Sequence, residues 1–89
     1  RQEAALRMAR GVDMVVVIGG RHSANTTRLA QICADAGKPT HHIGTAEEVD
    51  CAWLAGVERV GVTAGASTPD EAIRETIARL EACARERGD

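Results

Sequence analysis

The residues from Met14 to Asn25, MVVVIGGRHSAN, constrain the fold of this chain more than any other stretch. Five apolar residues run without a polar interruption into two consecutive glycines. Such a continuous run is typical of a strand covered on both faces, as in a parallel α/β sheet. Ser23 and Asn25 follow just before a helical pattern begins. The stretch therefore predicts a buried strand, a glycine loop and the start of a helix.

Further strand and helix patterns alternate along the rest of the chain. Strands alternating with helices imply parallel strands joined by right-handed crossovers, hence an α/β three-layer sandwich with a small parallel sheet. If the first strand is central, in the order 2-1-3, the loops after strands one and three flank one crevice. The predicted helices are 1–10, 23–36, 45–56 and one from residue 68 onward, and the predicted strands are 13–18, 40–43 and 57–63.

The helix start near Ser23 differs from the two later ones. Residues 45–48 (TAEE) and 68–71 (TPDE) read as capping boxes, whose acidic residues compensate the positive end of the helix dipole. The first turn after Ser23 contains no acid, so its free N–H groups can face an external anion such as a phosphate. Arg21 and Arg28 would add positive charge. The alternative is an ordinary cap that lacks an acid.

Residues 60–67 (VGVTAGAS) repeat the pattern of a strand followed by a glycine loop, and end in Ser67. We predict that the two loops lie side by side and that Ser23, Asn25 and Ser67 hold part of an anionic ligand. Neither loop matches a P-loop or a dinucleotide fingerprint. Charge-assisted hydrogen bonds contribute about 1.5 to 3 kcal/mol each before ordering costs, whereas micromolar affinity needs about 8 kcal/mol. We therefore predict a partial site.

The three histidines are candidates either for ligand contacts or for ordinary surface residues. His22 lies in the first loop and is either a ligand contact or a solvent-facing residue. His41 and His42 are adjacent, so on a strand they point to opposite faces and cannot jointly bind a metal in the usual way. We expect both to be surface residues of an edge strand.

The three cysteines, Cys33, Cys51 and Cys83, are odd in number and widely spaced, with no C-x-x-C motif. This pattern indicates neither a disulfide framework nor a metal knuckle. We expect free thiols, as in a reducing compartment, with Cys33 and Cys83 in the core.

Length and composition limit the possible partners. The 89 residues suffice for one domain, 1–89, with a modest core, because there is no Phe or Tyr and only one Trp. A net charge of -2 gives no basic face for nucleic acid. No apolar run approaches the roughly 20 residues of a membrane helix. We expect a soluble, cytoplasmic protein, and the start at Arg1 inside a helical pattern suggests a domain of a longer chain.

The segments GGRHSANTTRL and VGVTAGASTPDEAI together resemble the C-terminal domain of the hydroxymethylbutenyl diphosphate reductase family. These iron-sulfur enzymes end the non-mevalonate isoprenoid pathway. The likeness runs over nearly the whole chain, and the opening RQ-x-A resembles the segment that follows the family's last cluster-ligating cysteine. The resemblance implies three similar α/β domains and reductive removal of an allylic hydroxyl through a [4Fe-4S] cluster, giving isopentenyl and dimethylallyl diphosphates.

Motif matching implies diphosphate contacts at Ser23, Asn25 and Ser67, and Ala24 stands where many members have a second Ser. The family's cluster cysteines and its catalytic Glu and His match no position of this chain. The resemblance therefore implies that the chain alone neither ligates the cluster nor reduces the substrate, and that it works with the remaining domains and an unidentified electron donor. The alternatives are a stand-alone, flavodoxin-like phosphate- or nucleotide-binding module without catalysis, and a scaffold domain whose loops bind nothing.

Overall fold

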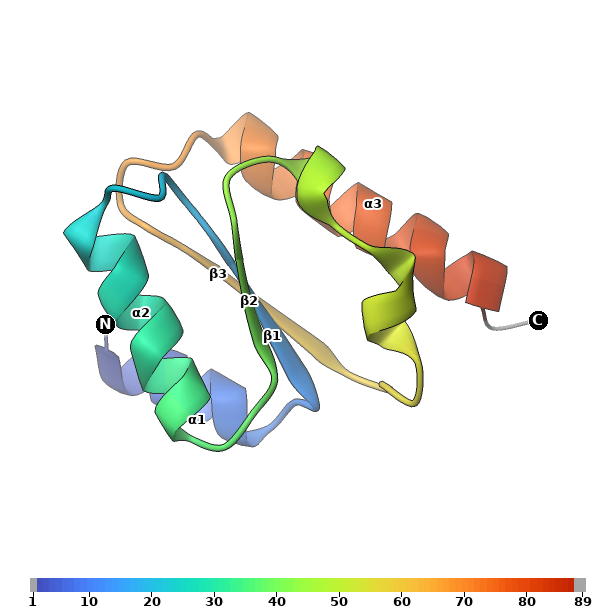
Figure 1. The fold of residues 1–89 in the computed structure, drawn as a ribbon, viewed down its shortest axis with the longest axis horizontal. Coiled ribbons are helices and arrows are strands. Elements are labelled where there is room, and N and C mark those ends of the chain that lie inside the picture. Colours follow the sequence, from blue (N-terminus) through green and yellow to red (C-terminus); the bar gives the residue numbers. More distant parts are fainter. Residues whose placement is uncertain (1, 88–89) are drawn as a thin grey trace.

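In the computed structural model, which describes residues 2–87, three parallel strands form one sheet with helices on both faces (Figure 1). The strand order is β2-β1-β3, and β1 pairs in parallel with both neighbours. The predicted three-layer α/β sandwich and the order 2-1-3 are therefore confirmed. The elements in chain order are α1 (Gln2–Arg10), β1 (Met14–Ile18), α2 (Ala24–Asp35), β2 (Thr40–Ile43), the 3-10 helices η1 (Ala46–Glu48) and η2 (Cys51–Leu54), β3 (Val60–Ala64) and α3 (Asp70–Arg87).

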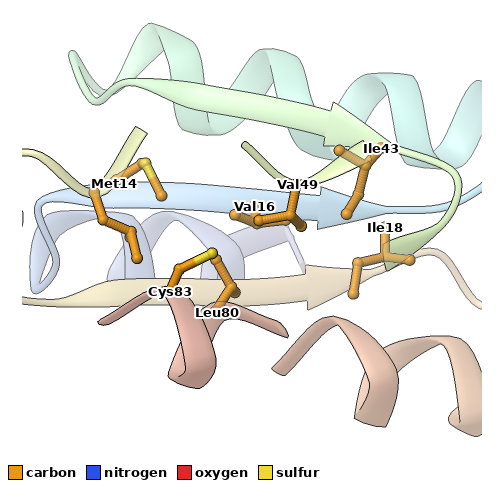
Figure 2. Close-up of a cluster of buried hydrophobic side chains, with 8 residues drawn as sticks. Met14, Val16, Ile18, Ile43, Val49, Leu80 and Cys83 are labelled. Atoms are coloured by element: carbon orange, nitrogen blue, oxygen red, sulfur yellow. The ribbon is translucent and has the colours of Figure 1, made fainter. Parts of the chain in front are cut away.

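The central strand β1 is buried along its whole length, as its apolar sequence predicts. Its side chains alternate between two separate parts of the core. Val15 and Val17 pack in the cluster formed with α1 and α2. Met14, Val16 and Ile18 belong to the other cluster, which also contains Leu80 and Cys83 of α3 (Figure 2). The sheet therefore needs cover on both faces, which the helices provide.

The single helix predicted for residues 45–56 is wrong, because the structure has the two short helices η1 and η2 there. Its start is as predicted, since the Glu48 carboxylate accepts the backbone N–H of Thr45 at 3.0 Å. The helix stops because Val49 adopts an extended backbone conformation and is only 3% exposed. Asp50 then caps η2 by accepting the N–H of Ala52. The extended backbone at Val49 therefore separates η1 from η2.

The expectation of three free thiols is wrong for two of them. Cys51 of η2 and Cys83 of α3 form a disulfide, with their Cα atoms 5.1 Å apart. The two residues are separated by 32 positions in the sequence, but η2 and α3 cover the same face of the sheet (Figure 1). The spacing of the two cysteines in the sequence does not predict that they lie close together in the fold. Cys33 is a buried free thiol, and Cys83 lies in the core as predicted.

Within the described part of the chain, none of the helices has the combination of length and apolar character that crossing a membrane requires.

Candidate functional site

The loops that follow β1 and β3 meet at the carboxyl edge of the sheet (Figure 1). The carbonyl of Ile18, the last residue of β1, accepts the N–H of Gly65 at 3.1 Å and the hydroxyl of Thr68 at 3.0 Å. Thr68, predicted to cap the last helix with its side chain, donates instead to β1. These two bonds fix the start of the second loop beside the end of β1, where the first loop begins. The predicted adjacency of the two loops is therefore present.

The side chain of Thr26 fills the space between the two loops. It is only 1% exposed, and a Cβ atom on either Gly19 or Gly65 would overlap its Oγ1 atom. Neither glycine has a positive φ, so the backbone conformation does not demand glycine at these positions. Glycine is needed at both positions because the side chain of Thr26 leaves no space for a Cβ atom on either loop.

Ser23 caps α2, as the sequence predicts. Its backbone is extended, and its Oγ accepts the N–H of Thr26 at 3.2 Å and the Thr26 hydroxyl at 3.0 Å. The first turn of α2 contains no acidic residue, whereas α3 begins with Asp70 and Glu71. The positive end of the α2 dipole is therefore not compensated by its own side chains.

The other predicted contact residues are exposed. His22, Ala24, Asn25 and Ser67 all have solvent-accessible side chains, and Ser23 is half-buried. Within residues 2–87, the side chains of Asn25 and Ser67 make no intramolecular hydrogen bond. Their polar groups are free to bind a solute. Ser67 lies in the second loop, and Asn25 lies in the first turn of α2, which follows the first loop.

Arg21 does not present an unpaired charge to this edge. Its guanidinium lies 2.7 Å from the carboxylate of Glu48, which also accepts the N–H of Gly44 at 2.8 Å. The Gly44 N–H, helped by Arg21, holds the pKa of Glu48 below its usual value. Arg21 therefore links the first loop to η1, and Arg28 is the exposed arginine of α2.

The two histidines of β2 make different contacts, as expected for neighbours on a strand. His41 stacks on Trp53 with ring centroids 3.8 Å apart, and burial lowers the pKa of His41. His42 Nε2 lies 3.2 Å from the Gly19 carbonyl. Both histidines lie on the edge strand β2, as predicted, and each is half-buried against a partner. His42 supports the first loop from the side opposite to the second loop.

Two hollows in the described chain lie away from the predicted contacts. The larger, about 800 Å³, is bordered by Asp13, Glu58 and apolar residues such as Leu80, at the end of the sheet where β1 and β3 begin. The smaller, about 510 Å³, lies beside β2 between Arg21 and Trp53. Neither is lined by the predicted contact residues of the two loops. The candidate site is therefore an open edge, not either of these hollows.

The residues present do not fit an iron-sulfur cluster, which is usually held by several cysteine thiolates. Cys51 and Cys83 are joined to each other, and Cys33 of α2 is buried in the core. In residues 2–87, no group of three or more His, Cys, Asp or Glu side chains is placed to hold a metal ion.

Thr26 and Thr68 brace the candidate site and were not identified from the sequence. Thr26 precedes Leu29 by three residues and Cys33 by seven, which is the spacing of one helix face. That periodicity could have revealed its burial. Nothing in the sequence indicates the bond from Thr68 to Ile18, which exists only because β1 and β3 are adjacent.

The fold and the loops define a parallel α/β domain that presents a helix start and unengaged hydroxyl and amide groups at the carboxyl edge of its sheet. The LytB protein family model matches residues 1–81, and the chain belongs to this family.

Two relatives of this chain carry the same enzyme name. The chain is 56% identical over 81 residues to 4-hydroxy-3-methylbut-2-enyl diphosphate reductase of Geobacter sulfurreducens, an alignment that covers 91% of the chain and 29% of the relative. It is 49% identical over 87 residues to the enzyme of the same name from Geotalea daltonii, covering 98% of the chain and 31% of the relative. The chain thus spans about 29% of the length of such relatives.

Solved structures agree with this membership. The structure of (E)-4-hydroxy-3-methyl-but-2-enyl diphosphate reductase, described as the terminal enzyme of the non-mevalonate pathway, superposes with a TM-score of 0.89 at 45% identity. The match covers 92% of this chain and 29% of that one. The Plasmodium falciparum reductase structure has a TM-score of 0.83 at 23% identity, covering 86% of this chain and 24% of that one, which shows the shared fold.

Proposed function

We propose that residues 1–89 are the C-terminal, third domain of a 4-hydroxy-3-methylbut-2-enyl diphosphate reductase and supply part of its diphosphate-binding pocket. The names and the 56% identity of the relatives support this proposal. The complete enzyme would reductively remove the allylic hydroxyl of its substrate, giving isopentenyl and dimethylallyl diphosphates. One observation in the structure carries the role of this chain, namely the acid-free start of α2 braced against the loop that bears Ser67.

The binding step follows from the donors at this edge. Diphosphate oxygens accept hydrogen bonds, and hydroxyl, amide and backbone N–H groups donate them. Ser23 and Ser67 would each donate a hydroxyl proton, and Asn25 its amide N–H. The uncompensated helix start adds a favourable dipole. Ala24 offers only its backbone N–H, and His22 is a further, exposed candidate contact.

The complete reductase would use a [4Fe-4S] cluster to pass electrons to the substrate. Because the cysteines described here do not fit such a group, its ligands would come from other domains of the enzyme. This chain would bind and orient the diphosphate, with no catalytic residue of its own. The electron donor would be a separate partner, and the proposed location is the cytoplasm.

The test substitutes Asn25→Ala or Ser67→Ala in the complete reductase. Each change removes a donor to a charged ligand, so we expect substrate affinity to fall roughly tenfold or more, with little change in thermal stability. Isothermal titration calorimetry gives the affinity. Thr27→Ala, an exposed position on the first turns of α2, is the matched control. Unchanged affinity in both site variants would contradict the proposal.

A further inference from the structure

The hydroxyl of Ser23 receives two hydrogen bonds from one residue, Thr26. The Thr26 N–H lies 3.2 Å and the Thr26 hydroxyl 3.0 Å from Ser23 Oγ. Thr26 is 1% exposed, and among residues 2–87 Ser23 Oγ is the only hydrogen-bond partner of its hydroxyl. A buried hydroxyl proton needs an acceptor. The Thr26 hydroxyl therefore donates its proton to Ser23 Oγ, and the Ser23 hydroxyl does not donate to Thr26.

These two hydrogen bonds determine whether the Ser23 hydroxyl can donate to a ligand or accept from it. A serine hydroxyl has one proton to donate and two lone pairs to accept with. Both accepting positions of Ser23 are occupied by Thr26, so its remaining capacity is to donate its own proton. A hydroxyl committed to donating suits an anion, whose oxygens only accept.

Thr26 also sets the distance between the two loops. Its Oγ1 lies where a Cβ of Gly19 or of Gly65 would stand. The loop bearing Ser23 and the loop bearing Ser67 therefore close onto the same side chain. A side chain with no atom at the Oγ1 position would leave the two loops without this shared contact.

We propose that Thr26 is a positioning residue of the diphosphate site, which commits the Ser23 hydroxyl to donating outward and holds the two loops at one separation. This inference rests on the function proposed above. Thr26 is buried beneath the loops and acts through Ser23, without touching the ligand itself.

The experiment uses the complete reductase and compares Thr26→Val, which keeps the shape but lacks the hydroxyl, with Thr26→Ser, which keeps the hydroxyl. We expect Thr26→Val to raise KM for 4-hydroxy-3-methylbut-2-enyl diphosphate roughly three- to tenfold, the effect of one hydrogen bond, with kcat changed less than about twofold. Thr26→Ser should keep KM close to the parent value. Thr27→Val, at the exposed neighbouring threonine, is the matched control.

Ser23→Ala separates this inference from the proposed function. If Ser23→Ala leaves KM unchanged, the proposed contact at Ser23 fails and the inference fails with it. If Ser23→Ala raises KM but Thr26→Val does not, the inference alone is overturned. If both raise KM, the double variant decides: we expect no effect of Thr26→Val in the Ser23→Ala background, since Thr26 then has no hydroxyl to orient. Additive effects would overturn the inference.

Thermal unfolding of each variant shows whether the domain is intact. Should Thr26→Val fail to fold, Thr26→Cys replaces it, because a thiol is a much weaker hydrogen-bond donor than the hydroxyl that Thr26→Ser keeps. A raised KM for Thr26→Cys against an unchanged KM for Thr26→Ser supports the inference. Equal KM values for these two variants would overturn it.

Discussion

At Gly65 the space for a side chain is already occupied by the Thr26 hydroxyl. Thr26 is branched at Cβ and enclosed between two loops, so it cannot swing away. We expect Gly65→Ala to destabilise the domain by about 1 to 3 kcal/mol, the usual cost of overpacking. Thermal unfolding measures the change. The control is Gly20→Ala, because a Cβ atom at position 20 would have no heavy atom within 4 Å apart from those of its own residue and its two chain neighbours.

A compensating substitution checks that the clash with Thr26 is the cause. Thr26→Ala removes the atom that the new Cβ would meet, so in the Gly65→Ala chain it should recover part of the lost stability. Equal melting temperatures for Gly65→Ala and Gly20→Ala would contradict the steric account of this loop.

Glu48 makes the stability of the first loop sensitive to acid. Hydrogen bonds from the Gly44 and Thr45 N–H groups and the ion pair with Arg21 favour its charged form, so its pKa is lowered from 4.5. A carboxyl whose pKa is lower in the folded state contributes stability above its unfolded pKa and loses it as pH falls through the folded value.

We therefore expect the difference in unfolding free energy between the parent chain and Glu48→Gln to shrink as pH falls below about 4.5. Urea unfolding at several pH values measures it. Glu47→Gln, at the exposed neighbouring acid, is the control and should show a smaller difference at every pH. The pKa of Asp13 is also lowered, by the N–H groups of Glu58 and Arg59, so acid sensitivity should persist in both variants. A difference independent of pH would refute the assignment to Glu48.

The residues of the candidate site were predictable to different degrees. Ser23 could be predicted as a cap because the preference for Ser at a helix start is local. The burial of Thr26 and the bond from Thr68 to Ile18 depend on β1 and β3 being neighbours. A sequence identifies groups that can bind a ligand more readily than groups that hold them in place.

Among the elements, strands were predicted better than the segments between them. β2 has the predicted bounds, 40–43, and β1 begins one residue later than predicted. β3 begins at Val60 and not at residue 57, because the N–H groups of Glu58 and Arg59 are bound by the Asp13 carboxylate. A run of apolar residues predicts a buried strand. The residue at which a strand begins depends on hydrogen bonds to distant parts of the chain, such as those to Asp13.

The disulfide between η2 and α3 gives a prediction for these elements. It closes a long loop that contains all of β3. In the chain-entropy account, a loop of this size stabilises the folded state by about 3 to 4 kcal/mol. We expect dithiothreitol to lower the melting temperature of the oxidised chain. The Cys51→Ala/Cys83→Ala chain should melt at a lower temperature and be insensitive to dithiothreitol. Identical melting of the oxidised chain with and without dithiothreitol would rule out a stabilising cross-link.

For the whole molecule, the alternation of strands and helices was sufficient to predict the architecture. Only a few arrangements allow short, right-handed connections between parallel strands. With β1 central, the loops after β1 and β3 must share an edge of the sheet, and the structure has this arrangement. What the alternation cannot predict is whether that edge is a complete pocket. That depends on what else surrounds it.

The open edge leads to a prediction about the affinity of the isolated chain. A helix start contributes about 0.3 to 1 kcal/mol to binding an exposed anion. Hydrogen bonds to a charged group add about 1.5 to 3 kcal/mol each, and association costs at least about 4 kcal/mol in lost translational and rotational freedom. Ser23, Asn25 and Ser67 together then leave only a few kcal/mol, which corresponds to roughly millimolar affinity.

We therefore expect inorganic pyrophosphate to bind the isolated chain no tighter than about 1 mM. Under the function proposed above, other domains would complete the site, and the complete reductase should then bind its substrate far more tightly. Amide chemical shifts of residues 19–25 and 65–67 during a titration measure the affinity, with Ser23→Ala as the control that should shift less. Micromolar binding by the isolated chain would instead favour a stand-alone phosphate- or nucleotide-binding module, since it would mean that one open edge supplies the whole site.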